Sequence, residues 1–304
     1  MGHGDAARGV NRALAEAAWA EVREPLDRQL SPLGAIGTLF PEPGEDVLDV
    51  GCGTGQTLLQ LAAMVGPSGS VVGLDIAPRL LAIARERAAA HPNISFIEAD
   101  AQTVRLPAAG FDAIYSRFGV MAFADPVAAF SNLRNALRFG GRLVFVCWRA
   151  LAHNELDHAP LRAAGLEHLA DMTPFSFSDH NYVVRVLRNA GFSDIAADVR
   201  NSWVSCGGVD ETLAVALAVG PQGRILRENP DLRPEAEPRV RRMLESRASG
   251  GYVEFRAATW VVTAWADGSQ LQSLLKRRRY MLSRVSRQTN AAETGSGDAT
   301  TEPS

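Results

Sequence analysis

The segment that most constrains the fold is VLDVGCGTGQ, at residues 47–56. Residues 47–50 are a short, mainly apolar run, which is typical of a buried strand. Three glycines follow at alternate positions, and glycine lets the backbone turn sharply and approach a ligand without a Cβ in the way. A dinucleotide-binding turn has the pattern G-x-G-x-x-G, but here Gln56 occupies the sixth position. The segment predicts a strand, a tight turn and a helix whose first N–H groups are free for a ligand.

Strand-like and helical segments alternate after this turn. The expected helices are at 56–66, 77–90 and 125–141, and the expected strands are at 47–50, 70–75, 94–100, 111–116 and 142–148. Asp125 and Pro126 are start signals for the third helix, and Gly140 with Gly141 is expected to end it. The alternation predicts right-handed crossovers and a doubly wound, mostly parallel α/β sheet. Such sheets bind ligands beyond the carboxyl ends of their strands, so the residues just after each strand are the candidate ligand contacts.

The pattern changes after residue 150. Helical segments are expected at about 10–40, 153–172 and 178–192. Strand-like segments at 193–204 and 252–265 are expected to form a closing antiparallel hairpin, with two helical stretches between them. Residues 271–287 predict a basic helix, and the polar tail after it is typical of disorder.

Composition excludes several classes of function. The chain has 304 residues, 46% of them hydrophobic, and a net charge of −3, so there is no global basic field for nucleic acid. It has no apolar run of about 20 residues and no secretion signal, so a cytoplasmic protein without a membrane span is expected. Cys52, Cys147 and Cys206 lack C-x-x-C spacing, which favours buried reduced thiols over a metal site.

Two aspartates stand at predicted strand ends. Asp75 comes 20 residues after Gly55, where a carboxylate can accept hydrogen bonds from ribose hydroxyls. This feature suits either a nicotinamide dinucleotide or an adenosyl cofactor. Asp100 ends the third strand, where its carboxylate can accept a hydrogen bond from an adenine amino group; the alternative is an aspartate that caps the next segment.

Together, the segments VLDVGCGTG, GLDIA, IEADAQ, FDAIYSRFGVMAF and LRNALRFGGRLVFVCW resemble the class I S-adenosylmethionine-dependent methyltransferases. The chain is most similar to the small-molecule branch that includes the quinone-biosynthesis enzymes, over about residues 40–150. The resemblance implies a Rossmann-like sheet with S-adenosyl-L-methionine as cofactor. It also implies helices at 1–40 over the cofactor site, a cofactor-binding core at 41–150, cap helices and closing strands at 151–266, and a basic helix with a tail at 267–304.

The resemblance also implies site residues. Asp49, Gly51, Cys52, Gly53 and Gly55 would surround the methionine end of the cofactor, with Asp49 near its amino group. The other implied contacts run along the neighbouring strand ends: Asp75 with the ribose, Ile76 against the adenine, Asp100 and Ala101 at the adenine edge, Ser116 at the methionine moiety, and Arg117 and Phe118 facing the acceptor.

Methyl transfer from a sulfonium mainly requires the reacting atoms to be held in line, and a base is needed only if the acceptor arrives protonated. His153, His158 and Tyr115 are candidates for that base, but no catalytic residue is assigned. A small-molecule acceptor is expected, without metal or nucleic acid, and a homodimer is an open option. The alternatives are a non-catalytic cofactor-binding protein and an NAD-dependent oxidoreductase.

Overall fold

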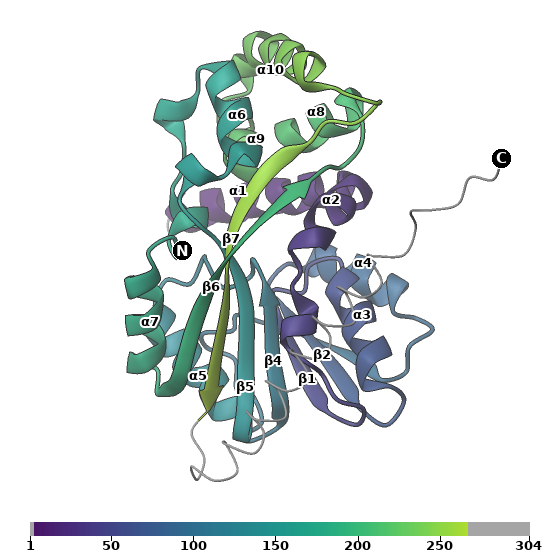
Figure 1. Ribbon diagram of the computed structural model, residues 1–304, viewed down its shortest axis with the longest axis vertical. Helices are drawn as coiled ribbons and strands as arrows, with labels where there is room; N and C mark the ends of the chain where they lie inside the picture. The colour runs from purple at the N-terminus through teal and green to yellow at the C-terminus, as the bar shows by residue number, and fades with distance from the viewer. Residues whose placement is uncertain (1–2, 267–304) are drawn as a thin grey trace, which may run out of the picture.

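The structure is a computed structural model that describes residues 3–266, with side chains from residue 12 onward. The strands of this range form one sheet in the order β3-β2-β1-β4-β5-β7-β6 (Figure 1). Every neighbouring pair from β3 to β5 is parallel, and β7 is antiparallel to both β5 and β6. The strands are β1 (Asp46–Val50), β2 (Ser70–Asp75), β3 (Ile94–Glu98), β4 (Phe111–Arg117), β5 (Leu137–Trp148), β6 (Phe192–Val204) and β7 (Phe255–Ala266).

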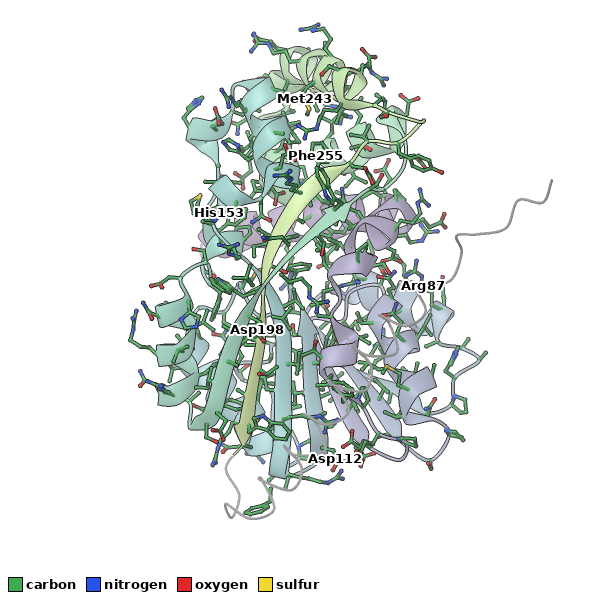
Figure 2. All side chains as sticks on the ribbon, in the orientation of Figure 1. Arg87, Asp112, His153, Asp198, Met243 and Phe255 are labelled. Atoms are coloured by element: carbon green, nitrogen blue, oxygen red, sulfur yellow. The ribbon has the colours of Figure 1, made fainter. Side chains whose placement is uncertain are left out.

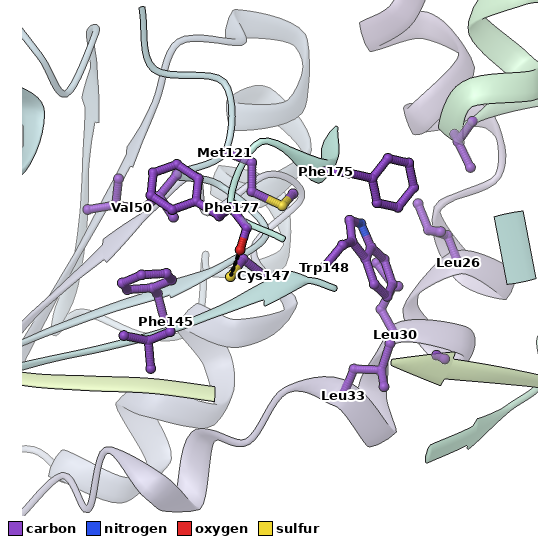
Figure 3. Close-up of a cluster of buried hydrophobic side chains, with 14 of the residues drawn as sticks. Leu26, Leu30, Leu33, Val50, Met121, Phe145, Cys147, Trp148, Phe175 and Phe177 are labelled. Carbon is purple, nitrogen blue, oxygen red and sulfur yellow. Dashed lines mark hydrogen bonds between the residues drawn. The ribbon is translucent and has the colours of Figure 1, made fainter. Parts of the chain in front are cut away.

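Alternate residues of the central strands enter two different cores, because successive side chains of a strand point to opposite faces. Val144 and Val146 of β5 pack with α3 (Gln56–Val65) and Leu81 of α4 (Pro78–Arg87). Phe145 of the same strand packs on the other face with α5 (Pro126–Ala136) and α7 (His180–Asn189). Figure 3 shows Phe145 in the second core and, beyond it, Trp148 facing the N-terminal helices.

A cap of helices stands beyond the carboxyl ends of the parallel strands. It comprises α6 (Glu155–Ala164), α8 (Val209–Ala218), α9 (Gly220–Glu228) and α10 (Arg233–Arg247), and the long strands β6 and β7 rise into it (Figure 1). Figure 2 shows Phe255, at the start of β7, among the cap helices and Asp112 at the opposite end of the sheet. Helices α1 (His3–Glu21) and α2 (Arg23–Leu30) cross between the sheet and the cap.

The predicted fold class is confirmed: the sheet is mostly parallel and is closed by antiparallel C-terminal strands. Several details were wrong. The third helix ends at Ala136 rather than at the glycine pair, because Leu137 already pairs with Phe111 and a register shift follows before Ala113 pairs with Arg142. Three α-helices, not two, separate β6 from β7 in the described chain. The predicted basic helix at 271–287 lies outside the described residues.

Two further sequence expectations concern cysteines and membranes. Cys52, Cys147 and Cys206 are buried and free of disulfide bonds in the described chain, and burial raises the pKa of each thiol. None of the helices within residues 3–266 combines the length and apolarity needed to cross a bilayer.

Candidate active site

The glycine turn lies where the strand order reverses between β1 and β4, which is the usual ligand site of such sheets. Gly51, Gly53 and Gly55 have φ angles of 71°, 54° and 86°, in the left-handed region that glycine adopts most easily. A Cβ on Gly51 would lie 2.5 Å from the Cα of Gly119, and one on Gly55 would lie 3.0 Å from the Cβ of Ala84. A Cβ on Gly53 would meet nothing within 4 Å. Two of the glycines therefore permit close packing, and Gly53 keeps space open.

A cavity of about 540 Å³ lies above this turn. Its floor is the turn, one side is formed by the ends of β2 and β3, and its roof includes residues of α1 and α2. The predicted site residues in its wall are Gly51, Cys52, Gly53, Asp75, Ile76, Asp100, Ala101, Arg117 and Phe118. Asp49, Gly55 and Ser116 do not line it: Gly55 is the last glycine of the turn, Asp49 precedes the turn on β1, and Ser116 bonds to Val50 just before it.

Asp75 connects the turn to the end of β2. Its Oδ2 accepts a hydrogen bond from the Gly53 N–H at 2.8 Å, and its Oδ1 accepts one from the Ala77 N–H at 2.9 Å. Burial raises the pKa of the Asp75 carboxyl, and the backbone hydrogen bonds oppose that shift. Each oxygen can accept a second hydrogen bond, so the carboxylate is available to a pair of hydroxyl groups in the cavity.

Asp49 is fully buried at the end of β1 and is incompletely paired. The Thr57 hydroxyl donates to its Oδ2, while its Oδ1 has no partner among the described residues. Burial raises the pKa of Asp49 to about 7, and the Thr57 hydrogen bond and the charge of Arg117 act in the opposite direction. Gln56, seven residues later at the start of α3, also has a buried and unpaired Oε1. Two unpaired acceptors beside the glycine turn favour a ligand group that carries N–H donors.

The wall at the end of β3 contains Asp100, Ala101 and Gln102. The Asp100 Oδ1 accepts a hydrogen bond from the Gln102 N–H at 2.8 Å. The capping alternative considered for Asp100 is therefore present, and the same residue also lines the cavity. Ile76, across the cavity wall at the end of β2, is 47% exposed, which leaves an apolar face free for a flat ring.

Ser116 contributes to the site through the backbone. Its buried hydroxyl donates to the Val50 carbonyl at 2.7 Å and accepts from the Gly119 N–H at 3.2 Å. These bonds join the end of β4 to the segment that packs against Gly51. Ser116 therefore holds the turn in place, and no part of it lines the cavity.

Phe118 separates the cofactor-side cavity from a second cavity of about 460 Å³ under the cap. Its ring stacks on Trp148 with centroids 4.0 Å apart, and its φ of 63° turns the chain at the end of β4. Residues from α1 and α2 also border both cavities. The shared wall residues are Ala15, Trp19, Leu26, Leu30, Phe118 and Ala122. The two cavities are thus adjoining halves of one site.

The three candidate bases from the sequence lie away from the second cavity. Tyr115 is buried in the core, where its hydroxyl donates to the Gly34 carbonyl and burial raises its pKa. The Nε2 of His158 lies 2.9 Å from Glu167 Oε1, and His153 is exposed in the short turn before α6 (Figure 2). None of the three lines either cavity.

Sequence reasoning missed several cavity residues. Gln56 lies inside a quoted segment, so its position could have indicated a role. Trp19, Leu26 and Asp157 could not be found in this way, because their helices reach the site only through tertiary packing. No group of three or more His, Cys, Asp or Glu side chains in the described chain is arranged to hold a metal.

Comparisons with known proteins agree with this geometry. Residues 47–141 match a family described as a methyltransferase domain. Aklanonic acid methyltransferase DauC of Streptomyces sp. (strain C5) is 40% identical over 119 residues, which cover 38% of this chain and 54% of that protein. Demethylmenaquinone methyltransferase of Thermus thermophilus is 43% identical over 111 residues, covering 36% and 50%. The chain thus spans about half the length of these curated relatives.

The fold comparison extends further along the chain. The YcgJ protein of Bacillus subtilis superposes with a TM-score of 0.54 at 16% identity, over 79% of this chain and 99% of that one. At this identity the likeness concerns the fold. The sequence matches place residues 47–141 in a methyltransferase domain. S-adenosyl-L-methionine is the cofactor of the S-adenosylmethionine-dependent methyltransferases that this domain resembles.

Proposed function

We propose that this chain binds S-adenosyl-L-methionine over the glycine turn and transfers its methyl group to an O, N or C atom of a small-molecule acceptor in the cavity under the cap. The observation that carries the proposal is the pair of adjoining cavities that share Phe118 and the N-terminal helices. One cavity is lined by the residues of the methyltransferase turn, and the other is closed off by structure outside residues 47–141.

The residues around the turn fit the proposed cofactor. An ammonium group would satisfy the buried Asp49 Oδ1 and the Gln56 Oε1, which have no other partner in the described chain. Asp75 offers two acceptor oxygens to ribose hydroxyls, and Ile76 offers an apolar face to adenine. The open space at Gly53 lets the cofactor contact the backbone directly. When bound, the cofactor supplies an activated methyl group on a positively charged sulfur.

The chain's own contribution is to bind, align and exclude water. Holding two reactants in line can account for about 7–11 kcal/mol of a barrier in favourable cases. Phe118, which lines both cavities, stacks on Trp148, which lines the cavity under the cap. Leu26 and Leu30 of α2 close the same region from above and are buried. These four side chains would keep the transferred group in an apolar, dry passage.

Incubation with methyl-labelled S-adenosylmethionine and a panel of hydroxylated, amino and quinone acceptors tests the function. We expect label in at least one acceptor class, with S-adenosylhomocysteine formed in equal amount. Tight cofactor binding with no transfer to any acceptor would favour the non-catalytic alternative. The methyltransferase family match argues against the NAD-dependent alternative, and binding of NAD in place of the adenosyl cofactor would reverse that choice.

A further inference from the structure

The cavity under the cap has an apolar wall with one unpaired acid. Its aromatic lining comes from three elements and the loop after β4: Trp19 of α1, Trp148 of β5, Phe255 of β7, and Phe118 of the loop. Leu156 and Pro160 of α6 extend the apolar surface. Asp157 lies on the same helix and also faces the cavity. A cavity of about 460 Å³ is within the usual range for small-molecule sites.

Asp157 has no neighbour that neutralises it. Its carboxylate makes no hydrogen bond or ion pair with any residue in the described range, and its Oδ1 instead lies against Gly220 at the start of α9. A Cβ on Gly220 would be only 2.8 Å from that oxygen. The glycine therefore leaves room for the carboxylate without binding it. Burial is the sole cause that raises the pKa of Asp157 to about 7.

The other charged groups around this cavity have partners elsewhere. Asp171 pairs with Arg224, which also pairs with Glu228. Arg227 donates to the Ala218 carbonyl, and burial lowers its pKa. The residues of α1, α2, β5 and β7 that line this cavity are all uncharged. The neighbours of Asp157 on α6 point to other partners: Glu155 pairs with Arg247, and His158 with Glu167.

An unpaired carboxylate in an apolar site is costly unless a ligand pairs with it. A flat aromatic acceptor would stack against the ring-lined wall, and a hydroxyl on that ring would donate to the carboxylate. We propose, on the basis of the proposed function, that Asp157 is the catalytic base that accepts the proton of a hydroxyl group on an aromatic methyl acceptor.

The proposed reaction is a proton transfer coupled to a displacement at the methyl carbon. The acceptor O–H bond breaks and its proton moves to the Asp157 carboxylate. The acceptor oxygen forms a bond to the methyl carbon while the bond from that carbon to the sulfonium sulfur breaks, and this electron pair remains on sulfur. The products are a methyl ether, a neutral thioether and a carboxylic acid that returns its proton to water. A base that titrates near neutral pH suits this task.

The test uses 2-naphthol as acceptor, naphthalene as its matched analogue without a hydroxyl, and the variants Asp157→Asn, Asp157→Glu and His158→Gln. In the wild type we expect kcat for 2-naphthol methylation to fall below about pH 7, and Asp157→Asn to lower kcat at pH 8 about a hundredfold or more and abolish this pH dependence. Asp157→Glu should restore part of the rate. His158→Gln, altered at the adjacent residue, should keep the wild-type profile.

Binding and stability provide readouts independent of turnover. With S-adenosylhomocysteine present, the wild type should prefer 2-naphthol over naphthalene, and this preference should fall about tenfold in Asp157→Asn. S-adenosylhomocysteine affinity should stay within about twofold, and the thermal midpoint at pH 8 should not fall, because an unpaired charge is removed. A wild type that binds no S-adenosylhomocysteine would refute the proposed function instead.

Three results would overturn the inference while leaving the proposed function intact. The first is a wild type that methylates other acceptors but neither binds nor methylates 2-naphthol. The second is an Asp157→Asn variant that retains the rate and its pH dependence. The third is a destabilised Asp157→Asn variant, which would show that the carboxylate has a structural partner.

Discussion

Substitution of the turn glycines by alanine should separate folding from cofactor binding. At Gly51, with φ of 71°, the new Cβ would lie 2.5 Å from the Gly119 Cα, more than an ångström inside an ordinary carbon contact. The left-handed backbone costs an alanine about 1–2 kcal/mol, and overpacking costs about 1–3 kcal/mol more. The expected loss of about 2–5 kcal/mol is a large part of a typical stability of about 5–15 kcal/mol.

Gly53→Ala should behave differently, because the new Cβ would meet no neighbouring atom within 4 Å and Gly53 itself lines the cavity. Only the backbone strain of about 1–2 kcal/mol applies to folding. A methyl group in the ligand's place should nevertheless weaken S-adenosylhomocysteine binding about tenfold or more, equivalent to at least about 1.4 kcal/mol. Gly250→Ala is the matched control: its φ is 58°, its Cβ also meets nothing within 4 Å, and it lies outside both cavities.

The assay is thermal unfolding together with calorimetric titration of S-adenosylhomocysteine. Gly51→Ala should lower the midpoint by roughly 5–15 °C. Gly53→Ala and Gly250→Ala should show equally small shifts, and only Gly53→Ala should lose affinity. Equal affinities for Gly53→Ala and Gly250→Ala would refute the assignment of the open space at Gly53 to the cofactor.

The remaining predictions concern three individual side chains. Asp75→Asn should weaken S-adenosylhomocysteine binding about tenfold, because hydrogen bonds to a charged acceptor contribute about 1.5–3 kcal/mol; an unchanged dissociation constant in calorimetry would exclude Asp75 from the ribose contact. Burial raises the pKa of Asp49 to about 7, and a bound ammonium group favours the ionised carboxylate. The affinity of the wild type for S-adenosylhomocysteine should therefore rise between pH 6 and 8, and the affinity of Asp49→Asn should change less over that range. Because the pKa of Asp49 is higher in the folded chain than in the unfolded chain, the unfolded chain ionises first as the pH rises. The free energy of unfolding should therefore decrease between about pH 4 and pH 7, by at most about 4 kcal/mol. Urea unfolding of Asp49→Asn should show a smaller decrease over the same pH range. Tyr115→Phe should cost about 1–3 kcal/mol because the buried Gly34 carbonyl loses its donor, with no change in the pH profile of methyl transfer; a changed profile would place Tyr115 in the chemistry.

The parallel half of the fold could be predicted because local signals agree there. Strands, glycine turn and helix caps all follow from residues near one another in sequence, as with Asp125, whose side chain accepts from the Ala128 N–H at 3.0 Å as an N-cap. The end of the same helix could not be predicted. The glycines at 140 and 141 suggested a helix stop, but pairing of Leu137 with Phe111 takes the segment into β5.

The cofactor side of the candidate site was also accessible from sequence, because its residues follow strand ends whose register is fixed by the sheet. The acceptor side was not. Asp157 lies in the polar segment HNELDH, which resembles an exposed helix. Its apolar surroundings come from α1, α9 and the strands of the sheet, and no local pattern reports that packing. The same reasoning explains why His153 and His158 were candidates although neither faces a cavity.

Calorimetric titration of the wild-type chain with S-adenosylhomocysteine, in parallel with NAD, tests whether the cavity over the glycine turn is an adenosyl-cofactor site. We expect one S-adenosylhomocysteine bound per chain with a micromolar or tighter dissociation constant, and no heat of binding from NAD. No saturable heat from S-adenosylhomocysteine at millimolar concentration would contradict it, because the cavity over the glycine turn would then have no adenosyl ligand to hold.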